Sequence, residues 1–327
     1  MKENSPIYTE ATELLRRAQR FNKETLIGVD KADWKPKLEY PNLPFAVGLF
    51  SDIHYGSIYT NYDLLDQHLK IVEDTPNFGM VTNGDDVDNF VVMGKSATGT
   101  YEDPLMPQLQ AIALMDKFKY LDKLGKLGAM SYGNHNNFTF ITGYDWLETW
   151  SRTLPKKIPI FTAGGELIIH VGKEKYDLAM SHKYWGSSRL NPTNSNKRFL
   201  EYEYPDADIT FLAHTHQSEM NIFERGGRER IAAIGGTYKE GEPWPRQQGI
   251  GRRSGHPGLT VLMWPNEHKM MGFKHSEDAS QFLLALIWKE EREKELKQEP
   301  KVFKIPNGII FEQPEIGEME RVSRLPK

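Results

Sequence analysis

The sequence predicts an α/β fold, and three features support this prediction. Between residues 45 and 154, short apolar runs alternate with amphipathic segments, which is typical of strands and helices in turn. Between residues 166 and 274, strand-like runs follow one another closely, which indicates a second sheet. Polar residues of the types that bind metals stand just after several apolar runs. Packing of the two sheets would give a four-layer α/β/β/α sandwich of mixed sheets.

The first of these regions is expected to alternate strand and helix. Its predicted strands are continuous apolar runs at residues 45–50, 78–82 and 127–132. Its predicted helices carry apolar residues on one face and span residues 62–72, 105–124 and 144–154.

The second region is expected to consist mostly of strands. A hairpin is predicted from residues 166–171 and 176–181, which flank the turn-forming sequence Gly-Lys-Glu-Lys. Further short strands are predicted at residues 209–213, 220–223, 230–234, 259–264 and 270–274.

The pattern divides the chain into three parts. Residues 1–39 are expected to form a peripheral N-terminal arm, and residues 40–275 the main domain. Residues 276–327 are expected to form a C-terminal extension. This extension contains an amphipathic helix over residues 278–297 and a strand-like run over residues 302–311.

The composition bounds the function without naming it. With 327 residues, 39% of them hydrophobic and 26% charged, the chain has an ordinary globular composition. A net charge of -4 gives no global basic field, so a polyanionic partner must be held by a local patch or by metal ions. The absence of cysteine excludes disulfides, thiolate zinc sites and cysteine nucleophiles. No apolar run suits a signal peptide or a membrane span, so we expect a cytoplasmic protein without a membrane partner.

Seven residues that can bind metals occur in short motifs after apolar runs. They are Asp52 and His54 in Ser-Asp-Ile-His, Asp85 in Asn-Gly-Asp-Asp-Val-Asp, Asn134 in Gly-Asn-His-Asn, His182 in Met-Ser-His-Lys, and His214 and His216 in Ala-His-Thr-His. Asp52 and His54 stand two apart at the end of a strand and point the same way, so both can reach one metal, and His214 and His216 have the same spacing. Carboxylate, imidazole and amide groups gathered at strand ends can hold two divalent ions, an arrangement that hydrolyses phosphate esters.

Residues beside these candidate ligands have other expected roles. Asp86 is expected to solvate its loop, whereas Asp88 is expected to accept a hydrogen bond that orients a ligand. His135 is the candidate catalytic residue, because a histidine can bind the phosphate or protonate the leaving oxygen near neutral pH. The alternative is a loop histidine with a structural hydrogen bond. The remaining histidines are expected at surface, core or loop positions: His68, His170, His256, His268 and His275.

The order Asp-x-His, Gly-Asp-x-x-Asp, Gly-Asn-His, a single His and x-His-x-His closely resembles the calcineurin-like metallophosphoesterase superfamily over residues 45–275. The resemblance implies a first metal ion bound by Asp52, His54, Asp85 and His216. It implies a second ion bound by Asp85, Asn134, His182 and His214, with His135 near the scissile phosphate. It also implies the four-layer sandwich.

Two divalent metal ions are therefore the expected cofactors. Mixed nitrogen and oxygen ligands favour manganese, iron or zinc over magnesium or calcium, and we expect manganese first. The positive charge of two divalent ions exceeds the negative charge of two carboxylates and a hydroxide. The surplus positive charge attracts a phosphate group. We expect in-line attack by a metal-bridging hydroxide, without a covalent enzyme intermediate.

Two positions depart from the family pattern. Asn136 stands where the family usually has an acidic residue that keeps the preceding histidine charged, which bears on the role of His135. Ala213 stands where glycine is usual, and it would cost about 1–2 kcal/mol if that backbone needed a positive φ angle. Neither change removes a ligand.

Substrate-binding side chains are expected among aromatic and arginine residues near the motifs: Trp185, Arg189, Trp244, Arg246, Arg252 and Arg253. Arginines bind phosphates and aromatic rings stack on bases, which favours a nucleic-acid substrate, DNA or RNA. The alternative is a solvated loop with aromatic rings packed beneath it. Asn89 and Phe90 replace the Arg-Gly of the family's serine/threonine phosphatases, which argues against a protein phosphatase.

These features predict a phosphodiesterase or nuclease, closest in motif style to the repair nucleases of the superfamily. The runner-up is a phosphomonoesterase that acts on a small phosphorylated molecule or nucleotide. A third hypothesis is a non-catalytic scaffold with the same fold, which the intact ligand set disfavours. The sequence leaves the oligomeric state open.

Overall fold

The computed structural model describes residues 27–92, 99–188, 190–241 and 256–297, together with the single positions 13, 16, 17 and 243. The chain divides into two compact units, Met1–Leu284 and Ala285–Lys327. In the second unit the described residues are helical and belong to α8 (Ser276–Lys297). The strand expected at residues 302–311 lies outside the described residues.

The first sheet has six strands in the order β12-β11-β2-β3-β4-β5. Their bounds are β2 (Phe45–Phe50), β3 (Phe78–Asn83), β4 (Leu127–Ser131), β5 (Ile160–Phe161), β11 (Leu259–Met263) and β12 (Met270–Phe273). Strands β2 to β5 run parallel, whereas β11 is antiparallel to β2 and β12. All residues of β2, β3 and β4 are buried, because both faces of this sheet are covered.

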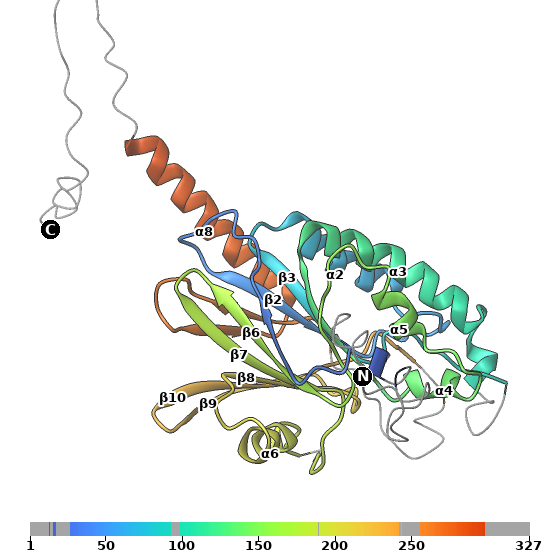
Figure 1. The fold of residues 1–327 in the computed structure, drawn as a ribbon. Coiled ribbons are helices and arrows are strands. Elements are labelled where there is room, and N and C mark those ends of the chain that lie inside the picture. Colours follow the sequence, from blue (N-terminus) through green and yellow to red (C-terminus); the bar gives the residue numbers. More distant parts are fainter. Residues whose placement is uncertain are drawn as a thin grey trace, which may run out of the picture. The chain divides into compact units, whose positions relative to one another are not determined.

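Helices cover the outer face of the first sheet (Figure 1). They are α2 (Tyr62–Asp74), α3 (Pro107–Leu124) and α5 (Trp146–Ser151), while the short α4 (Asn136–Phe140) follows β4. The side chain of Asn61 accepts a hydrogen bond from the Leu64 amide and caps α2. Gly125 ends α3 in the left-handed conformation, with φ 78°. These caps fix where each helix meets the loops of the sheet.

The second sheet has six strands in the order β1-β6-β7-β8-β10-β9. Their bounds are β1 (Lys31–Trp34), β6 (Gly165–Val171), β7 (Glu174–Ser181), β8 (Ile209–Leu212), β9 (Glu219–Arg225) and β10 (Arg228–Ile234). Helix α6 (Asn194–Tyr202) covers its outer face, where Phe199 and Leu200 pack with Leu212 and Ile234. This sheet is also mixed, because β6 and β7 form an antiparallel hairpin while β7, β8 and β10 run parallel.

The main hydrophobic core lies between the two sheets. Leu49 and Val81 of the first sheet share it with Leu178 and Phe211 of the second. The layers are therefore helices, first sheet, second sheet and α6 (Figure 1). The predicted α/β class and four-layer sandwich of mixed sheets are confirmed.

The predicted N-terminal arm is wrong in one part. Residues 31–34 form β1, an edge strand that pairs in parallel with β6. Trp34 is buried in the core between the sheets. Charged Lys31 and Asp33 alternate with the apolar residues of this strand, as an edge strand allows, and so mask the strand pattern. The main domain therefore begins before residue 31.

Three short elements lack a signal in the sequence. Strand β5 has only two residues, α4 has five, and α6 has a mostly polar sequence that buries Phe199 and Leu200. These lengths fall below what apolar periodicity can detect. Among the described helices, none has the length and apolar composition needed to cross a bilayer.

Candidate metal centre

The seven candidate ligands lie at one end of the sandwich, each just after a strand. Asp52 and His54 follow β2, Asp85 follows β3, and Asn134 follows β4, all in the first sheet. His182 follows β7, and His214 and His216 follow β8, in the second sheet. The carboxyl ends of these strands meet, so residues up to 164 positions apart in the sequence come together (Figure 1).

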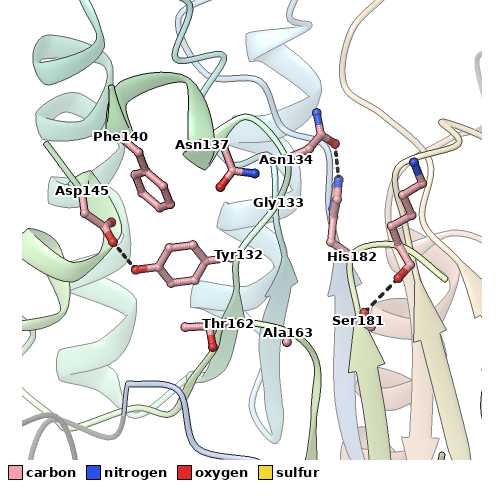
Figure 2. Close-up of a pocket in the computed structure, with 11 residues that line it drawn as sticks. Tyr132, Gly133, Asn134, Asn137, Phe140, Asp145, Thr162, Ala163, Ser181 and His182 are labelled. Carbon is pink, nitrogen blue, oxygen red and sulfur yellow. Dashed lines mark hydrogen bonds between the residues drawn. The ribbon is translucent and has the colours of Figure 1, made fainter. Parts of the chain in front are cut away.

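One group of ligands gathers around Asp85 and is called the Asp85 group: Asp85, Asn134, His182 and His214. His182 Nε2 lies 3.1 Å from Asp85 Oδ2 and 3.1 Å from Asn134 Oδ1, a contact that Figure 2 shows. His214 Nδ1 lies 2.7 Å from the same Asn134 oxygen. Two nitrogens and two oxygens thus point at a common centre.

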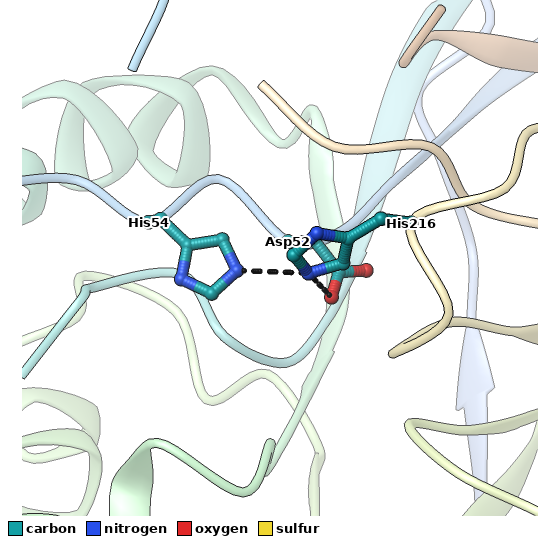
Figure 3. A group of neighbouring side chains, drawn as sticks. All are labelled: Asp52, His54 and His216. Atoms are coloured by element: carbon teal, nitrogen blue, oxygen red, sulfur yellow. Dashed lines mark hydrogen bonds and ion pairs between the residues drawn. The ribbon is translucent and has the colours of Figure 1, made fainter. Parts of the chain in front are cut away.

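The other group gathers around Asp52 and is called the Asp52 group: Asp52, His54 and His216. His216 Nε2 lies 3.2 Å from His54 Nε2 and 3.2 Å from Asp52 Oδ1, as Figure 3 shows. The groups are joined by the backbone, because the His54 amide donates to the Asp85 carbonyl (2.9 Å). In addition, the His214 amide donates to Asp52 Oδ2 (3.2 Å).

The donor atoms fit metal ions. Ligands about 2.0–2.2 Å from a metal lie roughly 3.0–3.5 Å apart around it, and the separations of 3.1 and 3.2 Å within the two groups match this spacing. Asp52 Oδ1 is buried and accepts no hydrogen bond from the described residues. Two imidazole nitrogens face each other in the Asp52 group, and two lone pairs placed in this way can bind one cation.

Two histidines are held in the tautomer that metal binding needs. His182 Nδ1 donates to the Asn83 carbonyl (2.7 Å), and His54 Nδ1 donates to Asp88 Oδ1 (2.7 Å). A proton on Nδ1 leaves a lone pair on Nε2, which faces the ligand group in both residues. Although burial opposes its charge, the bond with His54 holds the pKa of Asp88 well below its usual value.

Without bound cations, burial and the carboxylates set the protonation of the histidines. Burial lowers the pKa of both His54 and His214 to about 4, so both are neutral at pH 7. Burial also opposes the charge of His182, but the Asp85 carboxylate outweighs it and raises the pKa of His182 to about 9. In the absence of a metal ion, a protonated His182 therefore compensates the negative charge of the Asp85 carboxylate.

Backbone strain is concentrated at the ligands. Positive φ angles occur at Asp52 (49°), His54 (51°), Asp85 (52°), His214 (69°) and His216 (55°). A non-glycine residue in this region costs about 1–2 kcal/mol, and such strain is commonly found at functional sites. The expectation that paired ligands continue an extended strand is therefore wrong, because these residues curl out of their strands. Ala213 has a negative φ, so its methyl group causes no such strain.

His135 lies beside both groups. Its Nδ1 donates to the Asp88 carbonyl (2.6 Å), and its Nε2 lies 3.9 Å from Asp85 Oδ2. Its backbone amide donates to Asp85 Oδ1 (2.8 Å). The Asn136 side chain accepts a hydrogen bond from the Gly133 amide (2.8 Å). The carboxylate near His135 is instead Asp88, whose Oδ1 lies 3.6 Å from Nδ1.

Asp86 differs from the expected solvated acid, because its side chain is fully buried. Thr82 Oγ1 donates to Asp86 Oδ2 (3.2 Å). Burial raises the pKa of Asp86 to about 8, so it carries a proton at neutral pH. The sequence gives no sign of this, because the burial of a loop acid depends on how distant segments of the chain pack around it.

Two supporting residues are missed by sequence reasoning. Asn83 Nδ2 donates to the carbonyls of Ser181 (3.0 Å) and Phe211 (2.9 Å), and so ties the end of β3 to the ends of β7 and β8. Lys239 Nζ lies 3.2 and 3.3 Å from the Asp88 carboxylate oxygens and is buried. Asn83 belongs to the Asp85 motif, so the sequence could have indicated a role for it. Lys239 lies far along the chain from Asp88, so no local pattern predicts their contact.

A pocket of about 460 Å³ opens beside the Asp85 group (Figure 2). Tyr132 and Phe140 form an aromatic part of its wall, and Asn137 and Lys183 supply polar groups. Trp185 is not among the residues that line it. Its ring is 54% exposed, stacks on Tyr202 and lies under the Arg198 guanidinium (4.4 Å). The other expected substrate contacts lie outside the described residues: Arg189, Trp244, Arg246, Arg252 and Arg253.

The order of these motifs resembles that of the calcineurin-like metallophosphoesterase superfamily, and the structure places them on two packed sheets. No protein-family model and no curated protein matches it.

Several solved structures align with this chain at low sequence identity. Vacuolar Protein Sorting 29 from Cryptosporidium parvum is 12% identical, with 71% of this chain and 98% of that chain covered and a TM-score of 0.37. The nuclease MPE from Pseudomonas putida is 10% identical, with 69% and 87% covered and a TM-score of 0.31. A protein serine/threonine phosphatase from Saccharomyces cerevisiae is 12% identical, with 81% and 90% covered and a TM-score of 0.37. At such values the likeness assigns neither activity nor substrate.

Proposed function

We propose that the protein is a dinuclear metal-dependent phosphoesterase that hydrolyses phosphodiester bonds in nucleic acid. The observation that carries this proposal is the convergence of the Asp52 and Asp85 groups at one end of the two sheets. Each group offers one ion a mixture of imidazole and oxygen ligands, which suits Mn²⁺, Fe²⁺ or Zn²⁺. We expect Mn²⁺ first, with Asp85 as the bridge between the ions.

The charges of the centre favour an anionic substrate. Bound ions would polarise the phosphate and lower the pKa of the attacking water, in an in-line displacement. The two ions carry more charge than Asp52 and Asp85 return, so a phosphate is attracted. Asp88 does not reduce this surplus, because Lys239 and His54 pair with it.

His135 is proposed to act on the substrate. The Asp88 carbonyl fixes the proton on Nδ1, so Nε2 is left to face the centre beside Asp85. When it is protonated, Nε2 can donate a hydrogen bond to a phosphate oxygen or a proton to the leaving oxygen. The Asp88 carboxylate, 3.6 Å from Nδ1, can stabilise that charged form in place of the acid missing at position 136.

The pocket beside the Asp85 group supports a phosphodiester substrate. A diester has a second organic group, and the aromatic rings of Tyr132 and Phe140 offer a surface on which a nucleobase can stack. Lys183 adds a cation for a neighbouring phosphate. In addition, Asn89 is not available as a phosphate ligand, because its side chain donates to the His135 carbonyl (2.6 Å) and Thr139 Oγ1 (3.1 Å).

The test compares a diester with its matched monoester in the presence of Mn²⁺. We expect bis-(p-nitrophenyl) phosphate to be hydrolysed faster than p-nitrophenyl phosphate, and D85N to abolish both rates. The pocket's volume of about 460 Å³ also suits a small phosphorylated molecule, so a reversed ratio would favour the phosphomonoesterase. No hydrolysis of either, with metal verified by elemental analysis, would favour a non-catalytic scaffold.

A panel of labelled substrates then defines the nucleic acid. Single- and double-stranded DNA, RNA and cyclic dinucleotides are compared under the same conditions, each with D85N as a control for contaminating nucleases. Cleavage of DNA or RNA by the wild type alone supports the proposal. Hydrolysis confined to mononucleotides would move the assignment to the small-molecule alternative.

A further inference from the structure

A separate cluster of potential metal ligands lies in the first compact unit. It consists of His68 on α2, His256 just before β11 and Glu277 in the first turn of α8. One ligand atom from each of these residues lies within 4.8 Å of the others. The cluster shares no residue with the Asp52 and Asp85 groups.

Each residue of this cluster has a buried polar atom without a hydrogen-bond partner among the described residues. These atoms are His68 Nε2, His256 Nδ1 and Glu277 Oε2. The His68 side chain is fully buried, and its Nε2 lies 3.3 Å from the other Glu277 oxygen, Oε1. A buried polar atom without a partner is unfavourable, and three together are unusual in a native fold.

A cation satisfies these atoms better than water does. When the lone pairs of His68 Nε2 and His256 Nδ1 face Glu277 Oε2, three acceptors converge, and one water molecule has only two protons to donate to them. A divalent ion accepts a lone pair from all three at once. The 3.3 Å separation between His68 Nε2 and Glu277 Oε1 also matches ligands around one ion, which lie roughly 3.0–3.5 Å apart.

The surroundings hold the ligands in place. His68 Nδ1 lies 2.8 Å from the Tyr238 hydroxyl, which can accept its proton and leave the lone pair on Nε2. Gln67 Nε2 donates to Glu277 Oε1 (3.1 Å). Gly258 brings its backbone against the His68 ring with φ 113°, and a Cβ there would meet His68 Cε1 at 2.6 Å. The packing of Gly258 and the Tyr238 contact thus hold the His68 imidazole in one orientation.

We propose that His68, His256 and Glu277 bind a zinc ion that stabilises the fold. Two imidazoles and a carboxylate form a ligand set that zinc commonly accepts, with water in the fourth position. The ion would connect the middle of α2, the chain entering β11 and the start of α8. It would also support the metal centre, because the Tyr238 amide donates to the Asp52 carbonyl (3.2 Å).

The test counts zinc on the full-length protein. Protein stripped with a chelator is loaded with Zn²⁺, desalted and measured by elemental analysis, for the wild type, H256Q and E277Q. Each variant is expected to hold about one zinc per chain fewer than the wild type. The control is H268Q, since His268 lies outside the cluster and pairs with Asp208 instead. H268Q is expected to hold as much zinc as the wild type.

Thermal unfolding gives a second readout. Zn²⁺ should raise the unfolding midpoint of D85N, whose main centre is impaired, but the double variants D85N/H256Q and D85N/E277Q should lose that rise. Unchanged zinc content and midpoint shift in both H256Q and E277Q would overturn the zinc site and leave a buried hydrogen-bonded cluster. Failure of the proposed phosphoesterase is distinguishable, since it would appear as absent hydrolysis by the metal-loaded wild type, whereas failure of the zinc site would appear as unchanged zinc content in H256Q and E277Q.

Discussion

The carbonyl oxygen of Asn83 accepts a hydrogen bond from Nδ1 of His182 (2.7 Å), so the first sheet sets the ring orientation of a ligand from the second sheet. The Asn83 side chain adds bonds to the carbonyls of Ser181 and Phe211 at the ends of β7 and β8. One residue thus fixes the distance between the sheets and the tautomer of His182. The spacing of the Asp85 group depends on both.

We expect N83A to weaken both the fold and the metal centre. Two buried carbonyls would lose their donor, which costs ~1–3 kcal/mol each, so the free energy of unfolding should fall by about 2–6 kcal/mol. Affinity for Mn²⁺ should fall by about 10–100-fold, because the support of a ligand is lost. Urea unfolding and calorimetric titration measure the two effects.

Asn196 provides the matched control for this prediction. Its Nδ2 also donates to two buried carbonyls, those of Thr210 (3.0 Å) and Ala233 (2.8 Å), but it lies in α6 and, among the described residues, makes no hydrogen bond to a candidate ligand. N196A should lose similar stability and keep its Mn²⁺ affinity. Equal loss of affinity in both variants would show that general loosening, not the Asn83 contacts, weakens the centre.

H135A should separate catalysis from metal binding. His135 is placed beside the centre without completing either ligand group, so we expect turnover to fall about 10²–10⁴-fold while metal content stays at the wild-type value. Steady-state kinetics and elemental analysis on the same preparation measure both. A parallel loss of metal and turnover would make His135 a ligand and reject its assignment to the substrate.

D85N and D86N should behave differently although the residues are adjacent. Asp85 is a charged member of its ligand group, because the charges of His182 and His135 overcome burial and hold its pKa well below the usual value. D85N should therefore lose metal and activity together. Burial raises the pKa of Asp86 to about 8, so the neutral amide of D86N replaces a neutral acid and metal content should persist. Loss of metal in D86N alone would contradict this assignment.

Asp103 should make stability depend on pH. Burial, followed by the charge of Asp88, raises its pKa from 3.8 to about 7. Because the folded-state pKa is the higher one, the stabilising contribution is complete below pH ~4 and is lost as pH rises through about 7. D103N keeps a neutral group at every pH, so its unfolding free energy should fall less than that of the wild type between pH 4 and 8. We expect a difference of about 1–2 kcal/mol, below the ~4 kcal/mol of the full shift, because solvent screens this partly exposed group.

The readout for Asp103 is urea unfolding at pH 4.5 and pH 8. D66N is the control, because Asp66 is a surface acid whose carboxylate is 59% exposed in its pair with Lys117. D66N should follow the pH profile of the wild type. If D103N also follows it, Asp103 titrates with the same pKa in the folded and unfolded chain.

The parts of the fold with strong periodicity could be predicted from the sequence. Strands β2, β3 and β4 are continuous apolar runs because both faces are buried, and their predicted bounds agree with the structure within one residue. β1 escapes prediction because an edge strand tolerates Lys31 and Asp33. α4 and α6 escape because they bury too few apolar residues to show a period.

The candidate metal centre could be proposed from the sequence as a set of residues but not as a geometry. Motif order identifies Asp52, His54 and the other candidate ligands, yet their positive φ angles arise from tertiary hydrogen bonds, such as that from the Asp52 amide to the Gly84 carbonyl (3.0 Å). The burial of Asp86 and the pairing of Lys239 with Asp88 likewise depend on how distant loops pack. Local sequence patterns predict neither the burial of Asp86 nor this ion pair.

The most direct measurement is an anomalous difference map from crystals grown with Mn²⁺. We predict two peaks, one within bonding distance of Asp52, His54 and His216, the other of Asn134, His182 and His214, about 3.5–4 Å apart as in other two-metal sites. Asp85 should lie between them. A map without peaks at these residues, despite manganese in the crystal, would contradict the dinuclear centre.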